Sequence, residues 1–138
     1  MKVLGICSGY FAPLHDGHID YLRAAKRNCD ELWVIVNNDI QLKAKKGYIP
    51  MTQGARLKVM RAIYDVDSVY ISEDNDNTVT NTLRKIVDYV GDEYDFDLIL
   101  FFNDGDATNP PEHVDGVINV FLGNEKVNSS TEILSHGK

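Results

Sequence analysis

Apolar runs of strand length alternate with segments of helical periodicity along most of this chain, and this alternation limits its possible folds most. The run at 31–36, Glu-Leu-Trp-Val-Ile-Val, is almost continuously apolar, as in strands that are covered on both faces of a sheet. Such alternation is typical of a parallel sheet with helices packed on both faces. We therefore expect an α/β, Rossmann-like fold with an open parallel five-stranded sheet and helices on both faces.

The expected elements follow from periodicity and from turn residues. Strands are expected at 3–8, 31–36, 68–72, 97–102 and 117–122. Helices are expected at 17–28, at 53–64 and at 79–90, where Gly91 would end the helix, and a short helix is expected from about Ser130. A loop holding Pro50 is expected after the strand at 31–36. Ligands of such sheets bind beyond the carboxyl ends of the strands.

Composition excludes several functions. The chain has 138 residues, 43% of them hydrophobic, which suits one domain, 1–138, with a real core. The net charge of −7 argues against a broad nucleic-acid surface, which needs a basic patch. Cys7 and Cys29 are too few for a disulfide scaffold, and no apolar run is long enough for a membrane span. We expect a cytoplasmic protein without nucleic-acid or membrane partners.

Two histidines mark the corner between the first strand and the first helix, in the sequence His15-Asp16-Gly17-His18. Backbone N–H groups and the positive end of the helix dipole favour bound phosphate there. Gly17 allows the backbone to approach a ligand closely. Imidazoles can donate hydrogen bonds to a phosphoryl group as negative charge builds on it. The alternative is that both are ordinary surface or capping residues.

The stretch 9–18, G-Y-F-A-P-L-H-D-G-H, resembles the signature of the H-x-G-H nucleotidyltransferases, whose usual form is G-x-F-D-x-x-H-x-G-H. Further matches follow in the family's order at 36–39, 43–47, Arg56, 65–69, 103–106 and 129–133. The pattern is most similar to glycerol-3-phosphate cytidylyltransferases and heptose-1-phosphate adenylyltransferases. The resemblance implies an enzyme that transfers CMP or AMP from CTP or ATP to a phosphorylated small molecule, such as a sugar or polyol phosphate, and releases pyrophosphate.

The same resemblance implies roles for particular residues. The expected catalytic residues are His15, His18, Lys43 and Lys45. The expected nucleotide-binding residues are Gly9, Tyr10, Phe11, Gly17, Lys46, Asn103, Gly105, Asp106, Ser129, Ser130 and Thr131. Arg56 and Asp39 are expected to hold the acceptor. No metal site on the protein is expected, because Mg²⁺ would arrive with the triphosphate, and a homodimer is a possible assembly.

Each of these residues also has a structural interpretation. The lysines at 43–46 could lie in a solvated, mobile loop, and Arg56 could be a surface helix arginine. The hydroxyls at 129–131 could act only as helix caps, and 103–106 could be an acidic turn.

The chain also departs from the family pattern. Ala12 stands where an aspartate is usual, and Asn124 stands where the glycerol-phosphate enzymes have an arginine. The segment 107–111 is longer than in the similar families. The K-x-K-K sequence at 43–46 favours CTP, whereas the missing arginine favours ATP. The alternative function is a non-catalytic, nucleotide-binding regulatory module on the same fold.

Overall fold

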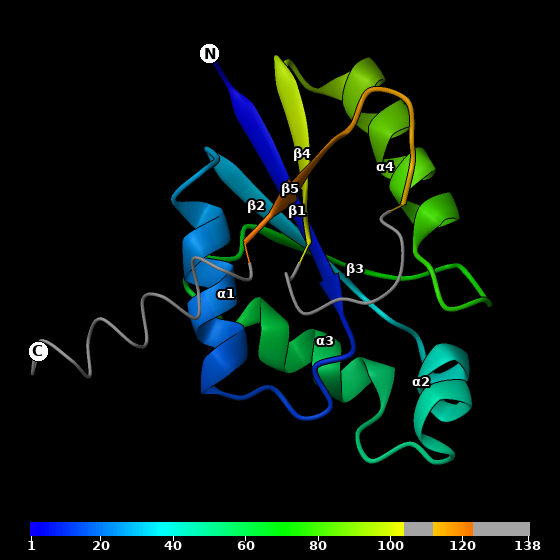
Figure 1. Ribbon diagram of the computed structural model, residues 1–138. Helices are drawn as coiled ribbons and strands as arrows, with labels where there is room; N and C mark the ends of the chain where they lie inside the picture. Colours follow the sequence, from blue (N-terminus) through cyan, green and yellow to red (C-terminus); the bar gives the residue numbers. More distant parts are fainter. Residues whose placement is uncertain (104–111, 123–138) are drawn as a thin grey trace, which may run out of the picture.

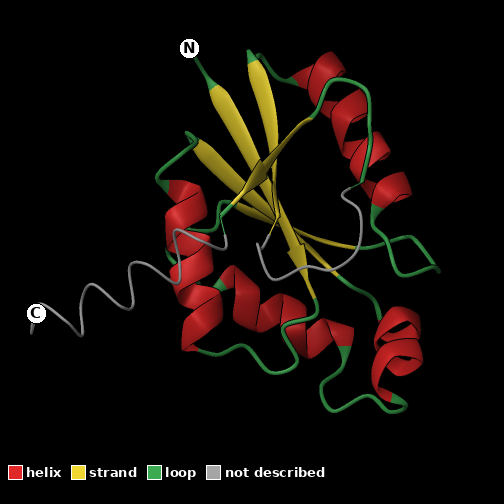
Figure 2. Cartoon of the chain, viewed as in Figure 1, coloured by secondary structure: helices red, strands yellow, loops and turns green. Residues whose placement is uncertain are grey.

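The computed structural model describes residues 1–103 and 112–122. In chain order the elements are β1 (Val3–Gly9), α1 (Asp16–Lys26), β2 (Glu31–Val36), α2 (Asp39–Lys46), α3 (Gln53–Arg61), β3 (Ser68–Ile71), α4 (Thr80–Glu93), β4 (Leu98–Asn103) and β5 (Ile118–Phe121). The strands form one sheet in the order β3-β2-β1-β4-β5, and every neighbouring pair is parallel. The expected open, five-stranded parallel sheet is therefore confirmed (Figure 2).

Helices cover both faces of the sheet, as expected. α1 and α3 lie on one face and α4 on the other (Figure 1). Because side chains alternate along a strand, Leu32 and Val34 of β2 pack with α1, while Trp33 and Ile35 pack with α4. All four side chains are almost fully buried, which explains why this strand reads as a continuous apolar run.

The strand order places the ends of β1 and β4 at the point where the sheet changes direction. From β1 the chain proceeds outward through β2 to β3, and it then returns to the other side of β1 with β4 and β5. The segments that follow β1 and β4 therefore diverge, and a crevice opens between them at the carboxyl edge. The strands that precede the candidate site residues predicted from the sequence end at this edge.

The segment after β2 differs from the expected loop, because residues 39–46 form a helix, α2. The Asn38 side chain accepts a hydrogen bond from the Gln41 N–H, and the Gln41 side chain accepts one from the Asn38 N–H. This reciprocal capping box satisfies two free donors and starts the helix. Gly47 ends it in the left-handed region, with φ +84°, a conformation that glycine adopts without strain.

Other element boundaries differ by a few residues. α1 ends at Lys26 and α3 at Arg61, earlier than expected. α4 continues through Gly91 to Glu93, so the prediction that Gly91 ends this helix is wrong. Tyr94 follows the last helical residue with extended backbone, and its ring packs against Trp33 with ring centroids 5.3 Å apart. The helix expected from Ser130 lies outside the described residues. Within the described ranges no helix is long and apolar enough to cross a membrane.

Candidate functional site

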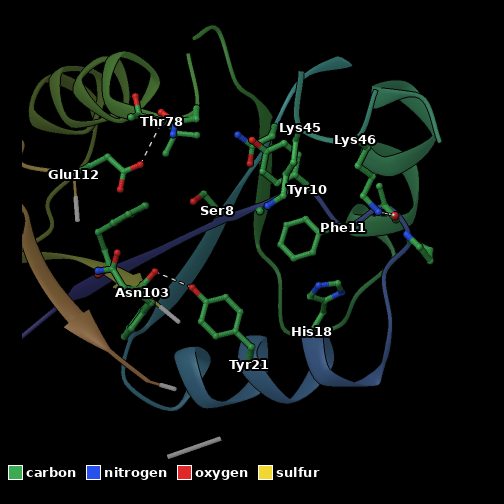
Figure 3. Close-up of a pocket in the computed structure, with 18 of the residues that line it drawn as sticks. Ser8, Tyr10, Phe11, His18, Tyr21, Lys45, Lys46, Thr78, Asn103 and Glu112 are labelled. Carbon is green, nitrogen blue, oxygen red and sulfur yellow. Dashed lines mark hydrogen bonds between the residues drawn. The ribbon is translucent and has the colours of Figure 1, made fainter. Parts of the chain in front are cut away.

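A cleft of about 780 Å³ opens at the carboxyl ends of β1 and β4. Figure 3 shows Tyr10, Phe11, His18, Lys45 and Lys46 on one side of it, and Thr78, Asn103 and Glu112 on the other. We call the first group the cationic side and the second the distal side. The remaining lining residues are Ser8, Gly9, Ala12, Pro13, His15, Tyr21, Asn37, Asn77, Val79, Phe101 and Phe102.

The two histidines form the cap of α1. His15 Nδ1 accepts the N–H of Gly17 at 3.1 Å, and His18 Nδ1 accepts the N–H of His15 at 3.1 Å. The rings stack with centroids 3.7 Å apart and planes 21° apart. An imidazole nitrogen that accepts a hydrogen bond carries no proton, so each ring holds its proton on Nε2. Both rings therefore present an N–H donor on the edge away from the helix backbone.

Phe11 fixes the orientation of this pair from the cationic side. Its ring meets His18 edge-on, with centroids 5.0 Å apart, and its backbone is in the left-handed region at φ +50°. A Cβ added to Gly9 would lie 2.7 Å from the Phe11 ring. Gly9 is therefore required by the packing of Phe11, and Phe11 in turn supports His18. The peptide bond between Ala12 and Pro13, which follows, is cis.

The predicted lysines lie on the last turn of α2, and the prediction that they form a mobile loop is wrong because that segment is a capped helix. Lys46 Nζ donates to the Ala12 carbonyl oxygen at 3.1 Å. Lys45 Nζ lies 4.4 Å from the centre of the Tyr10 ring, within reach of a cation–π interaction. Burial raises the pKa of Tyr10 above its usual value. Lys43 is exposed and is not among the cleft-lining residues.

Arg56 lies behind the cleft, with 1% of its surface exposed. Its guanidinium donates to the carbonyl oxygens of Tyr10, Asn37 and Met51 and to Asp39 Oδ1. Asp39 Oδ1 also accepts the N–H of Gln53 at 2.7 Å. This ion pair, of which the guanidinium is buried and the carboxylate partly exposed, ties the ends of β1 and β2 to the start of α3. Neither Arg56 nor Asp39 lines the cleft, so their predicted acceptor-binding role stays a prediction, and the geometry favours an organising role.

The distal side contains residues that sequence reasoning missed. Glu112 Oε1 accepts the N–H of Val79 at 3.3 Å, next to Asn77 and Thr78, which also line the cleft. Asp74 is buried and accepts the N–H groups of Asn81 and Thr82 at the start of α4. The sequence did indicate that 73–79 could reach the cleft. This segment follows an apolar strand directly, and parallel strands end at the same edge of the sheet as the histidines.

Gly17 is part of the α1 cap, where its N–H also contacts Asp16 Oδ1 at 3.0 Å, and it does not line the cleft. Gly105, Asp106, Ser129, Ser130 and Thr131 lie outside the described residues, as does Asn124. Within residues 1–103 and 112–122, no group of three or more His, Cys, Asp or Glu side chains could hold a metal ion.

This fold and this cleft define a class of protein. Residues 6–133 match the family model described as cytidylyltransferase-like. The chain belongs to that family and is an enzyme of the nucleotidyltransferase type, as the sequence predicted.

Two relatives with curated names are similar to this chain over about 100 residues. FAD synthase of Pyrococcus abyssi is 39% identical over 99 residues, which cover 70% of this chain and 67% of that protein. The bifunctional protein HldE of Rhodospirillum rubrum is 34% identical over 100 residues, which cover 70% of this chain and 20% of that protein. The chain thus spans about two thirds of the first relative and a fifth of the second.

Solved structures share the fold. A lipopolysaccharide core biosynthesis protein from Thermoplasma volcanium superposes with a TM-score of 0.58 at 20% identity, over 87% of this chain and 97% of that chain. NadR protein in complex with NAD and AMP-PNP superposes with a TM-score of 0.60 at 17% identity, over 96% of this chain and 42% of that chain.

Proposed function

We propose that this protein transfers AMP from ATP to the phosphate group of a small acceptor, and that FMN is the first acceptor to test. The FAD synthase of Pyrococcus abyssi supports this choice, because FAD is FMN that carries an added AMP. The observation that carries the proposal is the joining of the two-histidine cap and the α2 lysines in one cleft. FMN differs from the sugar or polyol phosphate expected from the sequence.

The proposed reaction is a single in-line displacement. A phosphate oxygen of the acceptor forms a bond to the α-phosphorus of ATP. The bond from that phosphorus to the bridging oxygen breaks, and pyrophosphate leaves with the bonding electrons. No covalent enzyme intermediate is needed, so catalysis depends on positioning and on electrostatic stabilisation.

The protein's own groups suit that task. The Nε2–H donors of His15 and His18 would bind phosphoryl oxygens, where negative charge grows in the transition state. Lys45 and Lys46, on the same side of the cleft as His18, would neutralise the negative charge of the triphosphate. Lys46 would exchange its bond to the Ala12 carbonyl for one to phosphate, because a charge-assisted bond to an anion is stronger.

In this proposal Mg²⁺ binds to the protein together with ATP. The described part of the chain offers no cluster of metal ligands, and Ala12 provides no carboxylate at the corner where the family usually has one. Mg²⁺ is therefore expected to bind ATP through phosphate oxygens and water.

A sugar phosphate is the second candidate acceptor, because HldE of Rhodospirillum rubrum is 34% identical over 100 residues. A regulatory module without catalysis is the third possibility, and the alanine at position 12 is the feature that favours it. The product that forms, or the absence of any product, distinguishes these three candidate functions.

The test follows α-labelled ATP in the presence of Mg²⁺ with FMN, riboflavin or a heptose 1-phosphate. We expect label in an FMN adduct and release of pyrophosphate, with none from riboflavin, which lacks the attacking phosphate. Transfer to the heptose phosphate alone would replace FMN by a sugar acceptor. If ATP raises the melting temperature but no label moves to any acceptor, the regulatory module would be supported instead.

A further inference from the structure

The distal side of the cleft holds a hydrogen-bond relay around Asn103, a residue that the sequence predicted to bind the nucleotide. Asn103 ends β4 and lines the cleft, whereas Asn119 lies on β5 beside it and does not line the cleft. Asn103 Nδ2 donates to Asn119 Oδ1 at 3.0 Å and to the Phe101 carbonyl oxygen at 3.2 Å. Asn119 Nδ2 donates to the Glu112 carbonyl oxygen at 2.9 Å.

Two backbone carbonyls determine the orientation of both amides. A carbonyl oxygen only accepts hydrogen bonds, so the amide group that faces it must be NH₂. The Glu112 carbonyl therefore directs the NH₂ of Asn119 toward itself, which leaves Asn119 Oδ1 facing Asn103. The Phe101 carbonyl holds the NH₂ of Asn103 in the same way. A flip of either amide would set oxygen against oxygen.

This arrangement leaves one kind of polar atom for a ligand. Both amide hydrogens of Asn103 are bonded, so Oδ1 is what its side chain can offer, and no donor in the described part of the chain bonds that oxygen. The Glu112 carboxylate, which lines the same cleft, is also an acceptor. The distal side therefore presents acceptors, whereas the cationic side presents donors from Lys45 and Lys46.

We propose that Asn103 and Glu112 select a donor nucleotide whose base carries an exocyclic amino group, and that Asn119 is the positioning residue which fixes Asn103 for this task. The inference rests on the proposed nucleotidyl transfer, since the phosphates would occupy the cationic side. The almost fully buried side chains of Val79 and Phe102 make the floor of the same cleft apolar. Adenine meets the acceptors with its 6-amino group, whereas a 6-oxo base would set oxygen against oxygen.

The experiment measures equilibrium binding of ATP, ITP, purine riboside triphosphate and tripolyphosphate, so it does not depend on turnover. We expect ATP to bind about tenfold more tightly than purine riboside triphosphate, which lacks the amino group, and ITP to bind less tightly still. Asn119→Leu frees the Asn103 amide and should bring the ATP and ITP affinities within about threefold of each other, with tripolyphosphate binding unchanged.

Two further variants separate positioning from folding. Asn119→Asp keeps an oxygen that accepts from Asn103 but sets its other oxygen against the Glu112 carbonyl, so it should lose the ATP preference as Asn119→Leu does. Ile118→Ala changes the neighbouring residue of β5, which is half exposed and does not line the cleft, and should behave as wild type. Full ATP preference in both the Asp and the Leu variants would overturn the role of Asn119.

The outcomes distinguish this inference from the proposed function. Wild-type protein that binds ATP, ITP and tripolyphosphate equally would overturn the selectivity and leave nucleotidyl transfer standing. Protein that binds none of these triphosphates would overturn both.

Discussion

Each of the two imidazoles at the start of α1 caps the helix with Nδ1 and presents Nε2 to the cleft. Each Nδ1 accepts a backbone N–H, and this bond places the ring proton on Nε2. The fold thereby selects the tautomer that can donate to a phosphoryl oxygen. The spacing of the histidines predicted a phosphate site, but the reciprocal cap depends on backbone angles that the sequence alone does not reveal.

His18→Ala tests the two roles together. We expect turnover to fall about 100-fold or more, because a donor to the transition state is lost. The free energy of unfolding should fall by only about 1 kcal/mol, the usual effect of losing a cap. Steady-state kinetics and urea denaturation measure the two effects, with His113→Ala, an exposed histidine outside the cleft, as control. Full turnover in the His18 variant would contradict the role of this ring.

Arg56→Ala tests the organising role of the buried arginine. Removing it leaves Asp39 without its cation and three carbonyl oxygens without their donor. We expect the free energy of unfolding to fall by roughly 3 kcal/mol. Lys58→Ala, at an exposed position of the same helix, should change it by less than about 0.5 kcal/mol.

A contact with the acceptor would give a different result for Arg56. The KM for the acceptor would then rise in the Arg56 variant while the stability remained close to that of wild type. Urea denaturation and kinetics on the same preparation therefore decide between the two roles.

The cysteines give a prediction with a defined pH dependence. Burial raises the pKa of Cys29 to about 11 and raises that of Cys7 further. Both thiols are therefore protonated at pH 8, and only the thiolate is nucleophilic. We expect slow reaction with a disulfide reagent at pH 8 in the native protein and rapid reaction in urea. Rapid labelling of the native protein would contradict the burial of these side chains.

At the scale of elements, short-range signals predicted most of the structure. The strands and the long helices have clear periodicity, and their positions agree with expectation to within a few residues. α2 was missed because it has only eight residues and just two buried side chains, Gln41 and Leu42, too few to show a period. The capping residues Asn38 and Gln41 were the feature of the sequence that indicated the start of this helix. The lysines that it carries were recognised, but their rigid setting was not.

A pair of glycine substitutions tests the helix boundaries. A Cβ at Gly91 or at Gly47 meets nothing within 4 Å, but only Gly47 has a positive φ, of +84°. Gly91→Ala should raise the free energy of unfolding by about 0.5–1 kcal/mol, because alanine favours the helix interior. Gly47→Ala should lower it by about 1 kcal/mol. Thermal and urea denaturation measure both, and stabilisation by both variants would contradict the left-handed end of α2.

At the scale of the whole molecule, the sheet connects two separate layers of core. Cys7, Leu22 and Val34 belong to the layer under α1 and α3, and Leu4 and Trp33 to the layer under α4. The alternating pattern predicted these layers, because strands buried on both faces need helices on both sides. It could not predict which distant side chains meet, such as Asn103 and Asn119, because such contacts depend on strand order and register.

The shared sheet predicts that both layers unfold together, as one domain. Trp33 is the single tryptophan of the chain and is 1% exposed, so its fluorescence reports the α4 layer. Far-ultraviolet circular dichroism reports the helices of both layers. We expect the two urea transitions to coincide. Separate midpoints would show that the layers are independent units.

The histidine cap also constrains how this sequence can evolve. Serine, aspartate or asparagine would cap α1 at least as well as histidine, and each is available by substitution without the demands of a stacked ring pair. A lineage in which the helix start alone was under selection would be free to exchange both imidazoles for such residues. Two histidines at positions 15 and 18 are therefore more than the start of the helix requires, and we expect a related sequence that no longer binds phosphate here to have lost both of them.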